Sequence, residues 1–385
     1  MPFSRRLFIQ GAGGAALGLS LVRCETQTIT SKGSGGAFSF LTPVDRDSTS
    51  DVIAQRQPGT FFTQRSGLTA LSIQFENIPI KTASGWSLEI TGEVSNPLTV
   101  DLANLQARTN DTVTILKTIR CIIDAPTLVP GLVGTALWTG VPLRVLLEEA
   151  GIDMQTTRRL RFFGYDSAEG VTQNLTLQEV MDAGSLGRLE PILAWGMNEG
   201  DIPHAHGGPV RLIVPGEYGY KQMKWLERIE ASTSDEVFGT YQEVVGFFDD
   251  GTVQVVSKLT NPLAAEPVPA GLFTIFGFAL SGSAPVARVQ VSLDEGDFVD
   301  AELLSEAEVL AEDPLLMDAL QFQAPGMSYP FPDVWAPFRL EVDLAPGAHT
   351  LRVKAVDANG DIQPDTDTDA LDGANSDFRV SFEAI

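Results

Sequence analysis

The sequence predicts an α+β fold in two parts, and two observations support this prediction. Up to about Asp250, strands with period-two alternation are interspersed with short segments of helical spacing. Beyond Asp250, short alternating strands follow one another with Gly, Pro and Asn-Gly turns between them, which is typical of an antiparallel sandwich. At 385 residues, with 43% hydrophobic residues, the chain is long enough for two or three globular domains with filled cores.

Net charge and cysteine content exclude several classes of protein. The formal charge of −24 argues against nucleic acid or an anionic membrane as a partner. It suits a solvated acidic surface that could also attract a basic redox partner. No stretch reaches the roughly 18 apolar residues of a membrane span. Two cysteines as far apart as Cys24 and Cys121 provide no disulfide framework.

The N-terminus has the pattern of a twin-arginine signal. Ser4-Arg5-Arg6-Leu7-Phe8-Ile9 precedes a mildly apolar, Gly/Ala-rich run over residues 11–22. This pattern predicts export of a folded protein to a periplasmic or other extracytoplasmic location. The segment ending in Cys24 hints at a lipidation box, but Arg23 stands where a small residue is expected. Lipid anchoring at Cys24 therefore stays an open alternative.

Individual elements follow from local periodicity and turn residues. A face of Leu143, Leu146, Leu147 and Ala150 predicts a helix that ends before Gly151. The expected elements are a strand from Trp86 to an Asn96-Pro97 turn, a helix over 141–150, a strand from Arg161 into a turn near Asp166, a short helix over 175–181, and an acidic, partly helical insertion over 303–323.

Cys121 stands where a β-branched run gives way to a loop rich in Pro and Gly. The end of a buried strand would fix the backbone there, and the loop would leave the sulfur open on one side. Because thiolates bind metals and act as nucleophiles in partly open, polar settings, both roles are candidates. The alternative is a buried free cysteine that acts as a small hydrophobic residue.

A second block, from Ile192 to Ile229, gathers His, Arg and Lys around glycines. Within it, His204-Ala-His206-Gly-Gly-Pro-Val-Arg211 precedes an apolar strand and Gly219-Tyr-Lys-Gln-Met-Lys224-Trp. The Arg guanidinium can form two parallel hydrogen bonds to a phosphate, and Lys supplies a compact positive charge. Glycine permits close approach of the backbone. These residues predict a site for an anion with a large heterocycle. The alternative is a turn with basic residues on the solvated face of a strand.

Both blocks resemble the sulfite oxidase family of molybdopterin enzymes. The run from Cys121 through Gly134-Thr-Ala-Leu-Trp-Thr-Gly-Val-Pro-Leu143 is similar to the family's cysteine loop, and the His206 to Trp225 block to its pterin- and phosphate-binding portion. The stretch from the Gly-Phe-Ala-Leu-Ser-Gly strand through Gly360-Asp-Ile-Gln-Pro resembles the family's immunoglobulin-like dimerisation domain. The predicted division is residues 1–30 for signal and linker, 31–251 for a molybdopterin-binding catalytic domain and 252–385 for the dimerisation domain.

The resemblance implies a cofactor and the residues that hold it. Cys121 would ligate molybdenum together with the two dithiolene sulfurs of one pyranopterin, in a bis-oxo or water-completed site without haem. His206 and Arg211 would grip the pterin and its phosphate. Lys224, the backbones of Gln222 and Met223, Phe62 and Asp166 would complete that grip, whereas His204 has no family role. A homodimer and a separate one-electron carrier such as a c-type cytochrome are implied, since the chain has no Cys-x-x-Cys-His or iron–sulfur set.

Departures from the family pattern bear on the substrate. Where the family has a Phe-x-Arg-Asn-His segment, this chain has Phe62, Gln64, Arg65 and Ser66, so the grip on a substrate anion is weakened at Gln64 unless Arg65 replaces it. Asp124 follows the cysteine and would repel sulfite. Phe247 stands where sulfite-oxidising members have a Tyr, and Tyr241 is a less favoured substitute.

The predicted function is an exported molybdopterin oxidoreductase that carries out two-electron oxygen-atom transfer at a Cys-ligated molybdenum. Its small-molecule substrate is expected not to be sulfite, and both the oxidase and the reductase direction stay open. Cys121, Gln64 and Phe247 are the candidate catalytic residues. The alternative is a degenerate relative that keeps the fold as a binding or scaffolding module.

Overall fold

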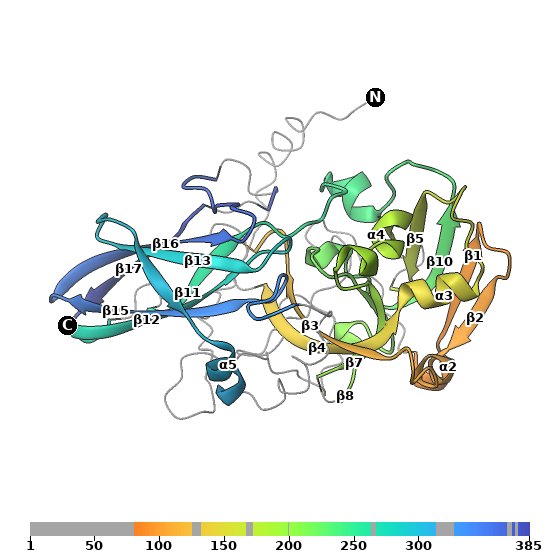
Figure 1. Ribbon diagram of the computed structural model, residues 1–385, viewed down its shortest axis with the longest axis horizontal. Helices are drawn as coiled ribbons and strands as arrows, with labels where there is room; N and C mark the ends of the chain where they lie inside the picture. Colours follow the sequence, from red (N-terminus) through yellow and green to blue (C-terminus); the bar gives the residue numbers. More distant parts are fainter. Residues whose placement is uncertain are drawn as a thin grey trace, which may run out of the picture.

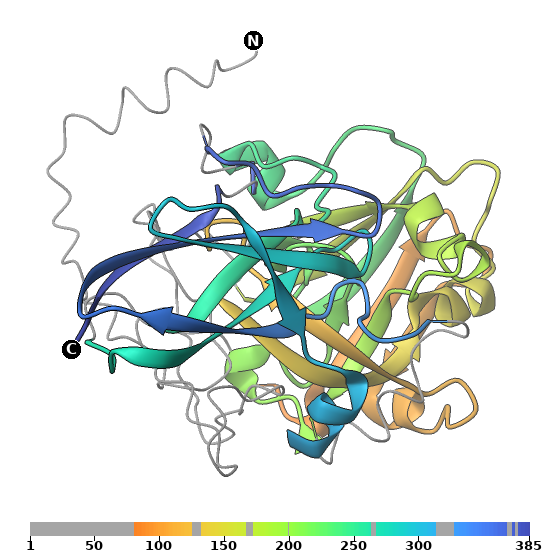
Figure 2. The ribbon, with the colours of Figure 1, turned by 60° about the vertical axis from the view of Figure 1, so that its left-hand side comes forward.

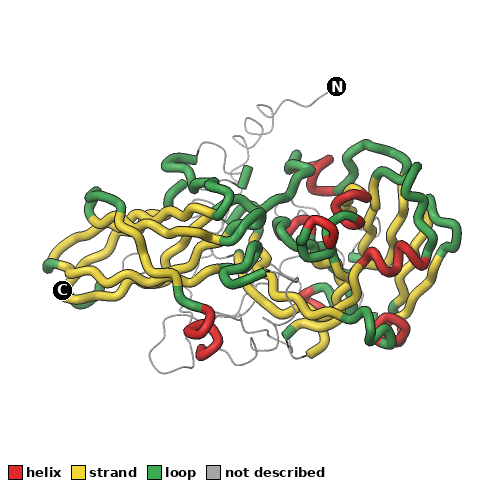
Figure 3. Tube along the Cα trace, in the orientation of Figure 1, coloured by secondary structure: helices red, strands yellow, loops and turns green. Residues whose placement is uncertain are grey.

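Two bodies of β-structure make up the described part of the computed structural model, which comprises residues 81–124, 132–166, 172–198, 200–262, 267–312, 327–367, 372–373 and 376–385. Figure 1 places the sheet of β1, β2, β5 and β10 at one end, the sandwich strands and the C-terminus at the other, and β3 and β4 between them. The predicted α+β class is confirmed, with short helices confined mainly to the first body (Figure 3).

The first sheet has the order β2-β1-β10-β5-β6, in which β1 runs parallel to β10 and the other neighbours are antiparallel. Alternation of apolar and polar residues explains these strands, because every second residue of β5 is buried. Its strands are β1 (Ser87–Gly92), β2 (Leu98–Asp101), β5 (Arg159–Gly164), β6 (Thr172–Thr176) and β10 (Leu226–Ser232).

The second sheet has the order β3-β4-β7-β8, with β9 paired to β7. It connects the two sequence blocks, because Cys121 directly follows its first strand and Arg211 begins its last. Its strands are β3 (Val113–Arg120), β4 (Val133–Pro142), β7 (Ile192–Met197), β8 (Gly200–Asp201) and β9 (Arg211–Ile213).

The C-terminal strands form the predicted sandwich, and Figure 2 brings its two layers forward. All seven strands follow one hydrogen-bonded order, β11-β12-β15-β14-β13-β16-β17, because β14 pairs with β15 in one layer and β13 in the other. The core between the layers includes Ile275, Val289 and Phe338. The strands are β11 (Val256–Asn261), β12 (Gly271–Leu280), β13 (Val286–Leu293), β14 (Val299–Leu303), β15 (Ala336–Leu344), β16 (Gly347–Asp357) and β17 (Phe378–Ala384).

The helices are short. The predicted helix over 141–150 is confirmed as α3 (Leu143–Glu149), although Val141 and Pro142 still belong to β4, where they pair with β7. The expected helix near 175–181 is α4, which begins with a capping box formed by Thr176 and Glu179. The bounds of α4 are Leu177–Met181. The other helices are α2 (Leu102–Gln106) and α5 (Glu306–Glu312), with the short helical turns η2 (Ala83–Gly85), η3 (Gly184–Leu186), η4 (His204–His206), η5 (Gly219–Lys221) and η6 (Tyr241–Val245).

The sandwich docks directly on β3. The backbone N–H of Thr118 donates to the carbonyl of Asp333 at 2.9 Å, and the Thr118 hydroxyl accepts from the N–H of Trp335 at 3.0 Å. Lys117 of the same strand forms a buried ion pair with Asp333. Leu116 joins Phe278 and Trp335 in one apolar cluster. The strand that leads to Cys121 is therefore fixed by both bodies.

None of the helices within the described ranges has the length and apolarity needed to span a membrane.

Candidate functional site

Cys121 lies at the end of β3 and is half-buried. Its N–H donates to the carbonyl of Leu132 at 2.9 Å, so the two ends of the cysteine loop are joined across residues 125–131, which lie outside the described residues. Burial raises the pKa of the thiol to about 11. A thiol with such a pKa is a poor nucleophile at neutral pH, and a bound cation would be needed to keep it as thiolate. The raised pKa therefore argues against the nucleophile role.

The structure contradicts the expectation that Asp124 repels an anionic substrate. Its carboxylate is fully buried and ion-paired, with Lys258 Nζ at 2.5 Å and Arg120 Nε at 3.4 Å from Oδ2. Its Oδ1 accepts from the N–H of Leu132 at 2.9 Å. The sequence alone could not reveal this neutralisation, because Lys258 belongs to β11 of the sandwich. Asp124 fastens the cysteine loop to the second body and presents no free negative charge to a substrate.

The second block brings His206, Arg211 and Lys224 together. His206 ends η4 with 0% of its surface exposed, and Arg211 Nη1 donates to the His206 carbonyl at 2.6 Å. Lys224 Nζ donates to the carbonyl of Ala205 at 2.8 Å. A methyl group added at Gly207 would stand 2.7 Å from Lys224 Cβ, so glycine permits this close approach. The predicted convergence of these three residues is observed.

Arg211 is a buried cation whose charge no described carboxylate neutralises. The side chain is 3% exposed, its two terminal nitrogens donate to backbone carbonyls of His206 and Gln222, and Nε has no hydrogen-bond partner among the described residues. Burial lowers the pKa of its guanidinium to about 9. Its guanidinium carbon lies 5.0 Å from the ring centre of Trp138, which belongs to the cysteine-loop motif. A buried guanidinium with a spare donor fits a phosphate.

Of the remaining predicted cofactor residues, Gln222 contacts Arg211, whereas Asp166 and Met223 lie at Gly164. The Gln222 carbonyl accepts from Arg211 at 3.2 Å, while the Gln222 amide side chain is bound to both backbone groups of Val214. Asp166 and Met223 flank Gly164, because a methyl group added there would lie 2.9 Å from Asp166 Oδ1 and from Met223 Cε. The structure thus brings Asp166 beside the Lys224 segment. His204 begins η4, the turn that His206 ends, and its carbonyl accepts a hydrogen bond from the Trp225 indole N–H at 2.9 Å.

Phe247 belongs to an aromatic cluster next to the cysteine. Its ring centre lies 5.1 Å from that of Tyr220 and 5.8 Å from that of Tyr241, with which it is stacked. The same cluster contains Ile122, directly after Cys121. Phe247 and Tyr241, the two candidates for the position of the family's Tyr, therefore share one region. Phe62, Gln64, Arg65, Ser66 and Cys24 lie outside the described residues.

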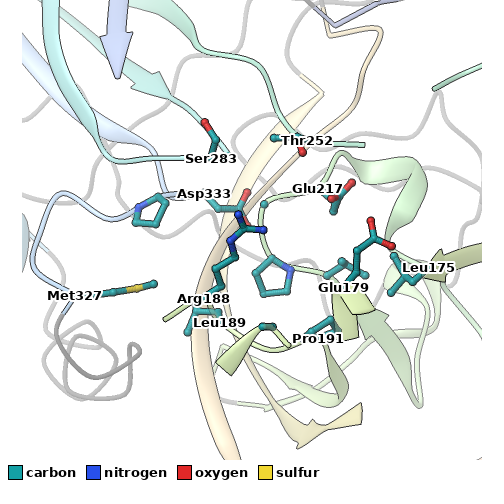
Figure 4. Close-up of a pocket in the computed structure, with 16 residues that line it drawn as sticks. Leu175, Glu179, Arg188, Leu189, Pro191, Glu217, Thr252, Ser283, Met327 and Asp333 are labelled. Carbon is teal, nitrogen blue, oxygen red and sulfur yellow. The ribbon is translucent and has the colours of Figure 1, made fainter. Parts of the chain in front are cut away.

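Sequence reasoning missed a group of charges buried where the two bodies meet. The group includes Lys117, Arg120 and Asp333, and a pocket of about 170 Å³ adjoins it. Figure 4 shows Glu179 and Glu217 on one side of this pocket and Ser283 and Met327 on the other, with Asp333 between them. The available signal was the presence of Lys and Arg within the apolar run of β3, because a charged residue in a buried strand needs a partner.

We expect Glu217→Gln to remove the part of the protein's stability loss that Glu217 causes as the pH rises. Burial raises the pKa of the Glu217 carboxyl to about 8, from 4.5. Between these values the folded protein binds more protons than the unfolded chain, so stability falls as pH rises. The melting temperature of the variant, relative to wild type, should therefore be higher at about pH 8.5 than at about pH 5. A pH-independent difference, matching that of the exposed control Glu243→Gln, would contradict this account.

Comparisons with known proteins agree with the geometry. The model of the oxidoreductase molybdopterin binding domain matches residues 75–238, and that of the Mo-co oxidoreductase dimerisation domain matches residues 251–384. The mitochondrial sulfite oxidase of Homo sapiens is 31% identical over 259 residues, or 61% of this chain and 43% of its own length. The sulfite oxidase of Gallus gallus is 27% identical over 366 residues, or 84% of this chain and 72% of its own length.

A solved structure supports the fold. The sulfane dehydrogenase SoxCD from Paracoccus pantotrophus superimposes with a TM-score of 0.63 and 24% identity, over 83% of this chain and 77% of its own. The two matched domains occur in the order of the two bodies of the structure. This chain therefore belongs to the sulfite oxidase family of molybdopterin-dependent oxidoreductases.

Proposed function

We propose that the protein is a molybdenum-cofactor oxidoreductase in which Cys121 is the protein ligand of the metal. The observation that carries this proposal is Arg211, a buried cation with a spare donor and no described carboxylate to neutralise it. Burying an uncompensated charge raises the free energy of the folded state unless an anion binds beside it. A pyranopterin phosphate supplies that anion, and a scaffolding protein would have no use for the arrangement.

Each residue of the site has a task that its surroundings support. Arg211, His206 and Lys224 hold the pterin end, and the backbone carbonyls that accept from Arg211 fix the direction of its guanidinium. Cys121 ends a strand held by both bodies, so its sulfur is placed before the metal arrives. The bound cofactor would supply two-electron oxygen-atom transfer.

The substrate proposed is a small molecule other than sulfite, oxidised or reduced by two electrons. The support for this now rests on Phe247, which brings an aromatic ring but no hydroxyl to the cluster beside Cys121. Asp124 does not select against sulfite, because its charge is paired with Lys258 and Arg120.

We further propose export by the twin-arginine route and electron exchange with a separate one-electron carrier such as a c-type cytochrome. The Ser4 to Ile9 pattern supports export. The negative charge of the chain supports a basic carrier. The dimerisation domain supports a homodimer.

Metal and pterin analysis tests the proposal. Protein produced with an intact molybdenum cofactor supply should contain about one molybdenum and one pterin per chain, as the single-pterin site predicts. The Cys121→Ala variant should keep the pterin, because Arg211 and Lys224 are unchanged, and should retain molybdenum less tightly through the pterin alone. Wild-type protein without molybdenum, under conditions that load a control enzyme, would refute the oxidoreductase and favour a scaffold.

A further inference from the structure

The segment from Asp235 to Asp250, here named the 235–250 surface, is acidic. Between Ile229 and Ser257 the sequence has six acidic residues and no Lys, Arg or His. Asp235, Glu236, Glu243 and Asp250 are exposed. Neither Glu236 nor Glu243 forms an ion pair with a described residue. This local excess of negative charge therefore faces solvent.

Apolar side chains are exposed on the same segment. Val237 and Phe248 are 42% and 43% exposed, respectively. Val237 precedes Phe238 and Phe248 precedes Asp249. The side-chain amide of Asn174 donates both to the Phe238 carbonyl and to Asp249 Oδ1. The two ends of the segment are thus held by one side chain, and each end carries an exposed apolar residue next to it in sequence.

Basic groups near this segment do not cancel its charge. Arg159 donates to the Asp235 carbonyl at 2.9 Å and pairs with Asp249 at 2.6 Å, so Asp249 is not counted among the free acids. Arg161 lies over the Phe238 ring and shares its charge with Glu230. Lys221 is buried beneath Asp249. The exposed carboxylates remain in excess.

The 235–250 surface also lies close to the metal ligand. Phe247, next to the exposed Phe248, packs in the cluster that contains Ile122, the residue after Cys121. Tyr241 stacks on Phe247 within the same segment. A protein bound here would contact a segment whose Tyr241 and Phe247 side chains pack in the same cluster as Ile122, the neighbour of Cys121.

We propose that the 235–250 surface is the docking site of the one-electron carrier, a small haem protein with a lysine-rich face around its exposed haem edge. Exposed carboxylates and exposed apolar side chains on one segment suit a transient complex, in which charge steers the approach and a small apolar contact aligns the partners. This inference rests on the proposed function. Each two-electron reduced molecule would pass one electron to each of two oxidised haem proteins in succession.

Stopped-flow reduction of ferricytochrome c, used as a basic probe, tests this site without the natural substrate. Molybdenum-loaded protein is reduced chemically, freed of excess reductant and mixed with the probe at several salt concentrations. Reversing two charges in Glu236→Lys/Glu243→Lys should lower the second-order rate constant about tenfold at low salt, and the difference should shrink as salt screens it. The control Asp111→Lys/Glu341→Lys changes the net charge equally at exposed sites elsewhere and should change the rate less than about twofold.

Two further measurements separate this proposal from the proposed function. Lysine-acetylated cytochrome c keeps the haem but loses the basic face, and should react slowly with wild type and with both variants alike. Calorimetric titration of cytochrome c into protein lacking metal should still detect binding that Glu236→Lys/Glu243→Lys abolishes. Equal losses in the test and control variants would overturn the docking site, whereas absence of molybdenum with this binding intact would refute only the proposed function.

Discussion

Replacing Asp124 by alanine is expected to lower the free energy of unfolding by about 3–5 kcal/mol, because it leaves Arg120 and Lys258 buried without their shared carboxylate. Lys258 pairs with Asp124 across the two bodies, and Oδ1 of Asp124 holds the N–H of Leu132 at the far end of the cysteine loop. The substitution should therefore both destabilise the protein and loosen the segment that carries Cys121.

Equilibrium denaturation of Asp124→Ala, beside the exposed control Asp111→Ala, measures this effect. The control should lie within about 0.5 kcal/mol of wild type, as is usual for surface positions. Asp124→Ala/Lys258→Met should recover part of the loss, because it removes one of the stranded cations. If Asp124→Ala were no more destabilising than the control, Asp124 would not fasten the loop.

The second large effect is expected from Arg211→Met, which should prevent retention of the cofactor. The guanidinium is the buried cation that we assign to the phosphate, and methionine provides no donor in its place. Because an uncompensated buried charge disfavours folding, the cofactor-free variant should be at least as stable as cofactor-free wild type. Arg211→Met is thus predicted to lose the cofactor and to keep the fold.

Molybdenum and pterin content after gel filtration, with melting temperatures of the cofactor-free proteins, checks this prediction. Arg228→Met is the matched control, since Arg228 is a partly exposed cation that stacks on Phe163 and pairs with Glu230. The control should retain the cofactor. If Arg211→Met retained its full cofactor content, the phosphate would be bound by residues other than Arg211, and the prediction would be wrong.

Local periodicity predicted much of the fold, but pairing decided its boundaries. The apolar face of Leu143, Leu146 and Leu147 correctly indicated α3. The helix was expected to begin two residues earlier, and it does not, because Val141 and Pro142 are held in β4 by pairing with Leu193 and Ile192. Such pairing depends on residues some 50 positions away, which a local pattern does not contain.

The convergence of the proposed cofactor residues was more predictable than the buried charge pairs near them. His206, Arg211 and Lys224 lie within one short segment, so their convergence follows from a local motif. The role of Asp124 was predicted wrongly, since its partner Lys258 comes from the other body. Lys117 and Asp333 likewise meet across 216 positions of sequence. Buried pairs between domains are set by the tertiary structure, and the sequence shows only that a charge occurs in an apolar strand.

X-ray absorption at the molybdenum edge tests most directly whether Cys121 binds the metal. Wild-type protein loaded with cofactor should have about three sulfur neighbours, two from the pterin and one from Cys121, and Cys121→Ala should have about two, as metal ligation by a single thiolate requires. The fold should be unchanged, since the Asp124 contacts that hold the loop are retained. An identical sulfur count in wild type and variant would contradict the account, because the metal would then be held without the cysteine on which the proposed site is built.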